Sequence, residues 1–387
     1  MDEDNEESQL DSSDLTTQKQ VLMWLQIICL VWVLITAVTL IGGGFKQATS
    51  GQAQELFKFA TNPIMGVIVG TVATAMIQSS STVTSIIVGL VAGGLPVNLA
   101  VPMIMGANMG TTITNTIVSI GHIRDKEEFQ RAFSAATIHD FFNLMCILIF
   151  LPIEIMFKPL EKMAGHISQS IISEEQFVSG TINFVGAITK PVLKLFQSLF
   201  SNLDNEVSGL VIIFLGVVLI FGAIYQIGRL MKSLMVGKAR KLLKAAIGRG
   251  PISGIMSGTI VTILVQSSST TTSLIIPLVG AGVLKVRDVY AFTLGANIGT
   301  CITALIAAMG VTGDSAGFAL QIALVHLLYN FIGVIAVYGI PFLREIPYKA
   351  AERLALKTCN NKLIGFGYIA GIFFILPAVA ILLQKLF

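Results

Sequence analysis

Charged side chains are scarce in this sequence of 387 residues and absent from long parts of it. Asp, Glu, Lys and Arg make up 12% of the chain, about half of what soluble globular proteins carry. Four runs contain none of these residues, and each is long enough to cross a bilayer: Pro63–Ile123, Gly250–Leu284, Val289–Gly313 and Ser315–Leu343. These absences exclude a soluble enzyme and a disordered scaffold. The net charge of +3 is too small to indicate nucleic acid as a partner.

Cysteine is scarce as well. The chain has four cysteines, and the longest polar segment, residues 158–208, has none. Neither a disulfide framework nor the spacing of a metal site is present, and no cofactor is expected. A cleaved signal peptide is not predicted, because Asp2 to Glu7 is acidic where a basic region should stand. We therefore expect an acidic, disordered, cytoplasmic tail at residues 1–20.

Apolar segments predict an all-α polytopic membrane protein. Five segments have the length and composition of single spans: Val21–Gly44, Phe133–Phe157, Gly209–Gly228, Gly317–Leu343 and Leu363–Leu383. Two further regions, Pro63–Gly121 and Pro251–Gly310, are too long for one span each and are rich in Gly, Ser, Thr and Asn. We expect each to form a broken hairpin followed by a broken helix. Because non-helical backbone within a membrane needs protein or water around it, both regions are candidates for the functional centre.

An internal repeat links these two regions. The pattern G-T-x-x-T-x-x-x-Q-S-S-S-T occurs at Gly70–Thr82 and again at Gly258–Thr270. The pattern G-A-N-x-G-T follows in both halves, at Gly106 and Gly295, and H-x-x-x-N follows at His139 and His326. The motifs stay in register over most of each half, so the chain is a duplication.

Basic residues predict that the two repeats are inverted with respect to each other. Residues 229–249 and 344–362 are rich in Lys and Arg, which places both in the cytoplasm by the positive-inside rule. The segment that follows the first repeat then lies outside and the one that follows the second lies inside. Inverted repeats with broken helices are typical of secondary transporters, whose site lies near the midplane of the bilayer.

The predicted organisation has five parts in a plasma or inner membrane, with a cytoplasmic N-terminus. They are the tail at 1–20, transport repeat 1 at 21–157, an extracellular loop at 158–208, transport repeat 2 at 209–343 with a basic cytoplasmic linker at 229–249, and a cytoplasmic loop with a C-terminal span at 344–387.

Hydroxyl and amide groups dominate the predicted site. The N–H groups at the ends of broken helices and the serine hydroxyls suit an anion with several oxygens, and neutral oxygens suit a small hard cation. A multivalent anion without fixed positive charge nearby would be poorly solvated, so we expect coupling to a cation. The alternative is that these serines only pack helices. His139 and His326 are interpreted as hydrogen-bonding residues between helices rather than as metal ligands.

Asp140 differs from the other polar residues of the repeats. It is acidic and lies well inside Phe133–Phe157, whereas the matching position in the second repeat is Leu327. A carboxylate within a membrane usually marks an ion path; the alternative is a structural carboxylate paired with a nearby group. We predict that Asp140 binds an additional cation.

These motifs resemble those of the type II sodium–phosphate cotransporters, and the short external loop without cysteine resembles that of bacterial members. The resemblance covers about residues 60–160 and 205–385 and is carried by Gln-Ser-Ser-Ser-Thr in both halves and by the stretch from Arg131 to Asn143. It implies a symporter that imports inorganic phosphate with sodium and is not an enzyme. The implied phosphate ligands are Ser79, Ser80, Ser267 and Ser268. The implied sodium ligands are Gln78, Asn108, Gln266, Ser269, Thr293 and Asn297.

The resemblance also bears on charge movement. A signature that separates electrogenic from electroneutral members falls on Ser134, Ala136 and Asp140. Because the aspartate is present, we expect an electrogenic transporter in which Asp140 contributes a further sodium site. Alternatives are a transporter of another oxyanion, such as sulfate or a dicarboxylate, and an ion channel. An intramembrane hydrolase is disfavoured, since no G-x-S-x-G motif occurs.

Overall fold

The computed structural model describes residues 17–49, 62–173, 175–246 and 250–386, and these form helices joined by turns. Within these ranges, six helices are long and apolar enough to cross a membrane: Thr17–Thr49, Lys126–Phe157, Asn205–Leu234, Val286–Met309, Gly313–Tyr338 and Lys362–Leu382. All five single spans expected from the sequence lie largely within these helices. The chain is therefore an all-helical, polytopic membrane protein. Of the predicted tail at 1–20, residues 1–16 lie outside the described residues.

The first half of the chain contains one long span, a set of shorter helices and a second long span. In chain order the helices are α1 (Thr17–Thr49), α3 (Pro63–Ile77), α4 (Ser80–Gly93), α5 (Val97–Gly110), α6 (Ile113–Ile120) and α7 (Lys126–Phe157).

The second half has a similar order of helices but not an identical one. Its helices are α10 (Asn205–Ala246), α11 (Pro251–Val265), α12 (Ser268–Ser273), α13 (Ile276–Gly280), α14 (Val286–Met309) and α15 (Ala316–Gly333), which continues as a π-helical segment at Val334–Tyr338. The last span consists of α17 (Lys362–Ala370), a π-helical segment at Gly371–Ile375 and α18 (Leu376–Leu386).

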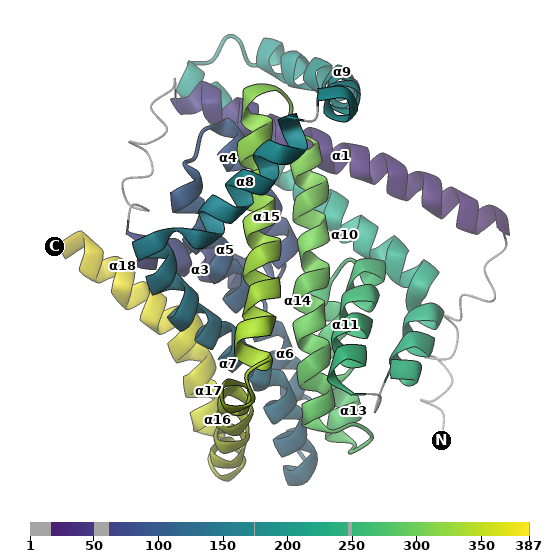
Figure 1. The fold of residues 1–387 in the computed structure, drawn as a ribbon, viewed down its shortest axis with the longest axis vertical. Helices are drawn as coiled ribbons and strands as arrows, with labels where there is room; N and C mark the ends of the chain where they lie inside the picture. The colour runs from purple at the N-terminus through teal and green to yellow at the C-terminus, as the bar shows by residue number, and fades with distance from the viewer. Residues whose placement is uncertain (1–16, 50–61, 174, 247–249, 387) are drawn as a thin grey trace.

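The polar segments between the spans are helical rather than irregular. Residues 158–208 contain α8 (Pro159–Ser173), α9 (Glu175–Leu199) and the first residues of α10. Residues 344–362 fall mostly in α16 (Pro341–Asn360). In Figure 1, α8 and α9 lie near the upper end of the molecule and α16 lies at the lower end. The basic segment that follows Gly228 continues α10 as far as Ala246.

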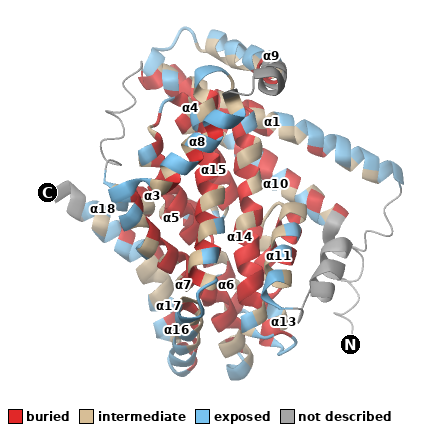
Figure 2. Ribbon diagram, viewed as in Figure 1, coloured by how far each residue is buried: buried red, intermediate tan, exposed pale blue. Residues whose placement is uncertain are grey.

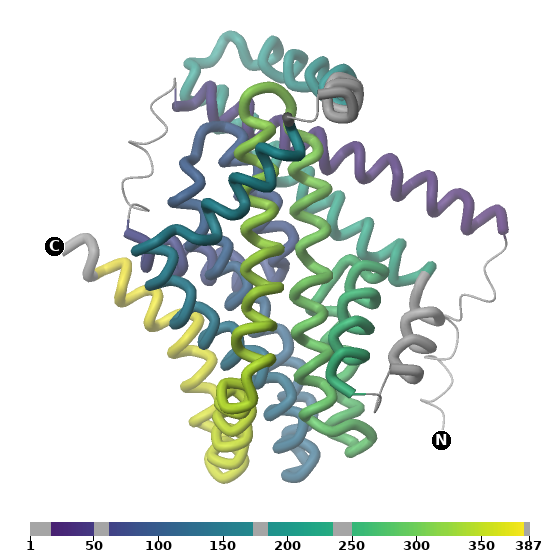
Figure 3. Tube along the Cα trace, in the orientation of Figure 1, coloured from purple at the N-terminus to yellow at the C-terminus, as the bar shows by residue number. Residues whose placement is uncertain are grey.

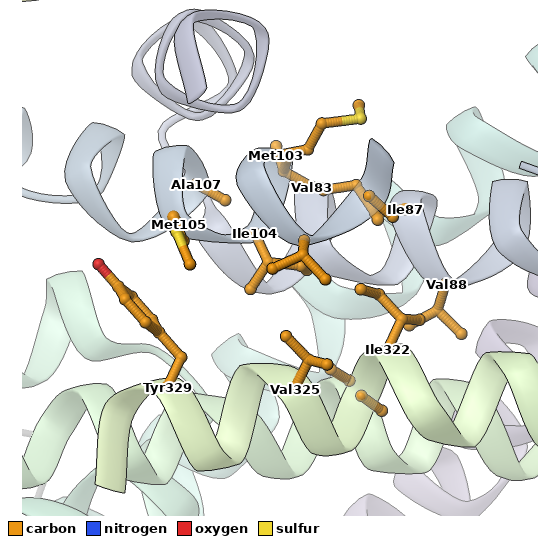
Figure 4. Packing of buried hydrophobic residues seen from close by; sticks show 14 of the residues in the cluster. Val83, Ile87, Val88, Met103, Ile104, Met105, Ala107, Ile322, Val325 and Tyr329 are labelled. Atoms are coloured by element: carbon orange, nitrogen blue, oxygen red, sulfur yellow. The ribbon is translucent and has the colours of Figure 1, made fainter. Parts of the chain in front are cut away.

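The most buried part of the molecule is formed where the two repeats meet. In Figure 2 buried residues concentrate along α14, α15 and the helices behind them, whereas α9 and the beginning of α1 are largely exposed. In Figure 4, Ile104 of the first repeat lies beside Val325 of α15, and Val88 lies beside Ile322. The trace in Figure 3 follows α14 and α15 side by side along the longest axis. A continuous core thus joins the halves.

One expectation about the second repeat is wrong. We predicted a broken helix after each hairpin, and the first repeat has one, because Thr111 and Thr112 separate α5 from α6. The corresponding helix of the second repeat, α14, is continuous. The Thr112 hydroxyl donates to the Met109 carbonyl at 2.8 Å, which competes with regular helix bonding. The matching residue of α14 is Cys301, whose thiol donates four residues back, to the Asn297 carbonyl.

Candidate functional site

A left-handed glutamine ends the first helix of each hairpin. Gln78 and Gln266 have φ values of 59° and 57°, in a region that residues other than glycine seldom adopt. Their N–H groups donate to the Thr74 and Thr262 carbonyls at 2.8 and 2.7 Å. The same uncommon geometry at matched positions, between apolar helices, makes both turns candidates for the functional site.

The serine after each glutamine starts the returning helix. Ser79 and Ser267 are extended, with φ values of −150° and −154°. Each hydroxyl accepts a hydrogen bond at 3.2 Å from the backbone N–H three residues later, at Thr82 and Thr270. This is the N-cap geometry that serine favours. The sequence Gln-Ser therefore ends one helix and caps the next within two residues.

Both glutamine side chains hold their turn against a neighbouring helix. The Gln78 amide oxygen accepts from the Thr114 hydroxyl of α6 at 2.6 Å, and the Gln266 amide oxygen accepts from the Thr303 hydroxyl of α14 at 3.2 Å. The amide nitrogens donate back to the helices that the glutamines end, at the carbonyls of Ala75 and Ile263.

The two turns line one cavity of about 440 Å³. The first contributes Ile77 to Thr82 and the second contributes Gln266 to Thr270. Ser80 and Ser268 are each only 4% exposed. In the described part of the chain, neither hydroxyl makes a hydrogen bond to the protein, so both can donate to a bound anion.

One face of α10 completes the wall of this cavity. Six of its residues contribute: Phe221, Ile224, Tyr225, Gly228, Arg229 and Lys232. Sequence reasoning missed the last two, because it treated residues 229–249 as a solvated linker. The available signal was their position directly after an apolar span, in helical register with Tyr225.

Close helix packing fixes the position of each turn. Helices α3 and α5 run parallel and so close that a Cβ at Gly70 would overlap the Met103 carbonyl oxygen. The same overlap would occur between Gly258 of α11 and the Phe292 carbonyl of α14. At both contacts a threonine hydroxyl crosses the interface, from Thr71 to the Gly106 carbonyl and in the same way from α11 to α14. The conspicuous glycines of both motifs therefore serve this packing.

Buried histidines join the repeats. His139 of α7 bonds through Nε2 to Oδ1 of Asn297 at 2.7 Å, and His326 of α15 bonds through Nε2 to Oδ1 of Asn108 at 3.0 Å. Both rings are 0% exposed. Since an amide oxygen only accepts, Nε2 is the protonated nitrogen in each ring. The histidines hold helices together, as the sequence indicated.

Two further asparagines complete this arrangement. Asn297 Nδ2 donates to Asn143 Oδ1 at 2.9 Å, and Asn108 Nδ2 donates to Asn330 Oδ1 at 2.7 Å. Each asparagine of a G-A-N motif is thus held by the H-x-x-x-N motif of the other repeat. We refer to the six residues as the cross-brace: Asn108, His139, Asn143, Asn297, His326 and Asn330.

Three of the predicted sodium ligands lie outside the cavity wall. Asn108 and Asn297 belong to the cross-brace, and the Thr293 hydroxyl donates to the Tyr290 carbonyl of its own helix at 2.9 Å. Each of these side-chain oxygens keeps a free lone pair, so their role as sodium ligands stays a prediction. Ser269, Gln78 and Gln266 do line the cavity.

Asp140 is enclosed at a separate place. It is 0% exposed, and its Oδ2 accepts from the Tyr368 hydroxyl of α17 at 3.0 Å and from the Thr116 hydroxyl at 3.5 Å. Its Oδ1 has no hydrogen-bond partner in the described residues. Within those residues no cluster of three or more His, Cys, Asp or Glu side chains could hold a metal ion. Tyr368 was not expected from the sequence, because it lies in the last span.

The chain is similar in sequence to a known family and to known proteins. The family model described as Na+/Pi-cotransporter matches residues 33–174 and 218–375. The chain is similar to sodium-dependent phosphate transport protein 2B of Homo sapiens, with 30% identity over 90% of this chain and 62% of the relative. It is also similar to protein 2A of Rattus norvegicus, with 27% identity over 90% of this chain and 66% of the relative. The chain thus spans less than two thirds of these relatives' length. No solved structure matches it.

Proposed function

The chain belongs to the Na+/Pi-cotransporter family, and from that premise we propose that it is a secondary active symporter that imports inorganic phosphate with sodium. The observation that carries the proposal is the single cavity lined by both Gln-Ser-Ser-Ser turns. A volume of about 440 Å³ is within the range of small-molecule sites, which is roughly 300–1,000 Å³.

The paired serines suit a tetrahedral oxyanion. We assign phosphate to Ser79 and Ser80 from one turn and to Ser267 and Ser268 from the other. Hydroxyl groups from both sides can donate to different oxygens of one anion, and hydrogen bonds to a charged acceptor are about twice as strong as neutral ones. The first backbone N–H groups of α4, which has 14 residues, add a partial positive charge.

Sodium coordination in this proposal uses neutral oxygens around the same centre. Ser269 and the two turn glutamines lie in the cavity wall, and we assign Thr293, Asn108 and Asn297 to the shell behind it. Asp140 is proposed as an additional, separate sodium site, because its unpartnered Oδ1 is a buried oxygen with a negative charge to balance. A sodium ion bound there would make transport electrogenic.

The proposed topology is inverted. We propose that α3–α4 and α11–α13 are re-entrant hairpins that enter a plasma or inner membrane from opposite sides, with the N-terminus in the cytoplasm. Arg131 near the start of α7 bonds to the Gly280 carbonyl at the end of α13, so α7 and α14 begin at the same end. Helices α5 and α6 lead toward that end and α14 leads away from it (Figure 1).

Transport in reconstituted vesicles tests the function. The purified protein in phosphatidylcholine vesicles should accumulate radiolabelled phosphate under an inward sodium gradient and not under a potassium or proton gradient. Excess sulfate or succinate should leave uptake unchanged. If sulfate or succinate blocks uptake, the substrate is another oxyanion rather than phosphate. Large unitary currents without uphill accumulation would indicate a channel.

Labelling of single cysteines tests the topology. In a Cys29→Ser background, which removes the exposed native thiol, cysteine at Ser201 between α9 and α10 should react with an impermeant reagent from outside. Cysteine at Lys349 in α16 should react only from the cytoplasmic side. Reaction of both from one side would contradict the inverted arrangement.

A further inference from the structure

Two basic side chains stand beside the serines that we assign to phosphate. Arg229 and Lys232 of α10 line the same cavity as both Gln-Ser-Ser-Ser turns, and none of the described acidic residues lines it. With Tyr225 they are spaced as one helical face. Helix α1, the span that precedes the other hairpin, contributes no residue to the cavity wall. The cavity therefore carries positive charge from one side only.

Arg229 lies on α10 at the same level as the second Gln-Ser-Ser-Ser turn. A Cβ at the preceding residue, Gly228, would be 4.0 Å from the carbonyl oxygen of Val265, the residue before Gln266. Helix α10 continues past this point to Ala246 and α11 returns from Pro251. Lys232 is therefore about one helical turn, roughly 5 Å, beyond Arg229 toward the end where α10 and α11 are joined.

Among the described residues, no carboxylate balances the charges of Arg229 and Lys232. In the described part of the chain, neither takes part in an ion pair, whereas Arg287 on the same half pairs with Glu345 at 2.8 Å. Both basic residues belong to the candidate span Asn205–Leu234. An unpaired cation in an apolar span is costly unless it meets water or an anion. The cavity beside them offers a place for an anion with phosphate oxygens.

We propose that Arg229 and Lys232 bind the phosphate oxyanion at the cytoplasmic side of the cavity and accept it as it leaves the paired serines. This proposal rests on the proposed function and adds to it a step that only one side of the transporter possesses. The sodium ions balance the anion while the serines hold it, and the two basic residues replace them during release. Phosphate affinity from the cytoplasmic side should therefore depend on these residues more than affinity from outside.

Lipid headgroups carry the same phosphate chemistry, and both side chains are exposed enough to reach them. The transported anion is favoured because the residues share a cavity wall with the serines. Vesicle composition separates the two sources. An effect of the residues on phosphate in purely phosphatidylcholine vesicles supports the transported anion, whereas an effect confined to vesicles with phosphatidylglycerol would overturn the proposal in favour of a lipid contact.

The test uses the full chain in vesicles whose protein orientation has been determined. The variants are Arg229→Gln, Lys232→Gln, the double variant and the conservative Arg229→Lys. Sodium-dependent exchange of radiolabelled phosphate is measured with the phosphate concentration varied on one side at a time. The double variant should raise the half-saturating phosphate concentration on the cytoplasmic side about tenfold and the external one by less than twofold. Arg229→Lys should retain most of the affinity.

A matched control removes charge elsewhere at the same end of the molecule. Lys349→Gln, at an exposed position of α16 outside the cavity, should leave both half-saturating concentrations unchanged. Higher ionic strength should weaken cytoplasmic binding by the wild type more than by the double variant. If the wild type transports phosphate and the double variant equals it on both sides, this proposal is wrong while the proposed function stands. If the wild type does not transport phosphate, the proposed function itself is wrong.

Discussion

The two repeats share the glutamine turns and the cross-brace, and they differ in the helix that follows each hairpin, at Asp140 and in the basic residues of α10. Both have the left-handed glutamine, the capping serine and a histidine that reaches the other repeat. The first repeat has a carboxylate at Asp140, where the second repeat has Leu327. Among the described residues, only the span before the second hairpin, α10, places basic residues in the cavity wall. From this contrast we infer that the duplicated elements build the proposed substrate site from two similar halves. The unmatched residues are the ones available for coupling and for directional release.

The largest expected effect comes from the helix contacts that both repeats share. Gly106→Ala and Gly295→Ala should each destabilise the protein by about 3 kcal/mol or more, because a Cβ would overlap the Val67 or Ile255 carbonyl oxygen. Melting temperatures in detergent measure this effect. The matched control is Gly222→Ala, which has no atom within 4 Å of the added carbon. Similar melting temperatures for all three variants would contradict the packing.

The cross-brace should also respond alike in both repeats. His139→Ala and His326→Ala each leave a buried asparagine oxygen without its donor, which costs about 1–3 kcal/mol. His166→Ala, on the exposed face of α8, is the control and should melt like the wild type. If one histidine variant has a much lower melting temperature and the other does not, the two halves of the cross-brace are not equivalent.

Asp140 should distinguish the repeats in function rather than in stability. Asp140→Gly should lower the charge moved per phosphate while the serine-lined cavity still binds phosphate. Substrate-induced current and tracer flux in the same vesicles give this ratio. Glu154→Gln provides the control, because Glu154 lies near the end of the same helix and bonds to the Leu160 and Glu161 N–H groups. An unchanged ratio in Asp140→Gly would make the carboxylate structural.

The smallest effect is expected at Tyr368. Tyr368→Phe removes the hydroxyl that donates to Asp140 Oδ2, which is worth about 0.5–1.5 kcal/mol. The half-saturating sodium concentration should change by roughly two- to tenfold, and the charge moved per phosphate should not change. Tyr329→Phe is the control, since the buried Tyr329 hydroxyl has no partner in the described residues. If both variants have the same sodium dependence, Tyr368 of the last span does not contribute to the Asp140 site.

The sequence predicted the class of fold and the two turns because repetition and charge report on them directly. Long uncharged runs mark the spans, and the matched Gln-Ser-Ser-Ser motifs mark the cavity. The sequence contains no comparable signal for contacts between segments that are distant along the chain. The pairing of His139 with Asn297 depends on how α7 meets α14, and the approach of Tyr368 to Asp140 depends on where the last span packs.

Two other differences between the sequence prediction and the structure have local causes. The sequence patterns of α5–α6 and α14 are nearly the same, and the exchange of Thr112 for Cys301 was too small a signal to predict that one helix breaks and the other continues. The basic residues of α10 were read as part of a linker because charge runs are usually solvated. Their role in the cavity wall follows from the path of the helix, which continues through Arg229 and Lys232 beside the second turn.

The central claim is that the two turns form one phosphate site, and equilibrium binding of radiolabelled phosphate in sodium tests it most directly. The wild type should bind one phosphate per chain. Ser80→Ala and Ser268→Ala should each weaken binding by roughly ten- to a hundredfold, and Ser85→Ala, whose hydroxyl only bonds to its own helix, should not. Two phosphates per chain, or normal binding in either of the first two variants, would contradict a shared site.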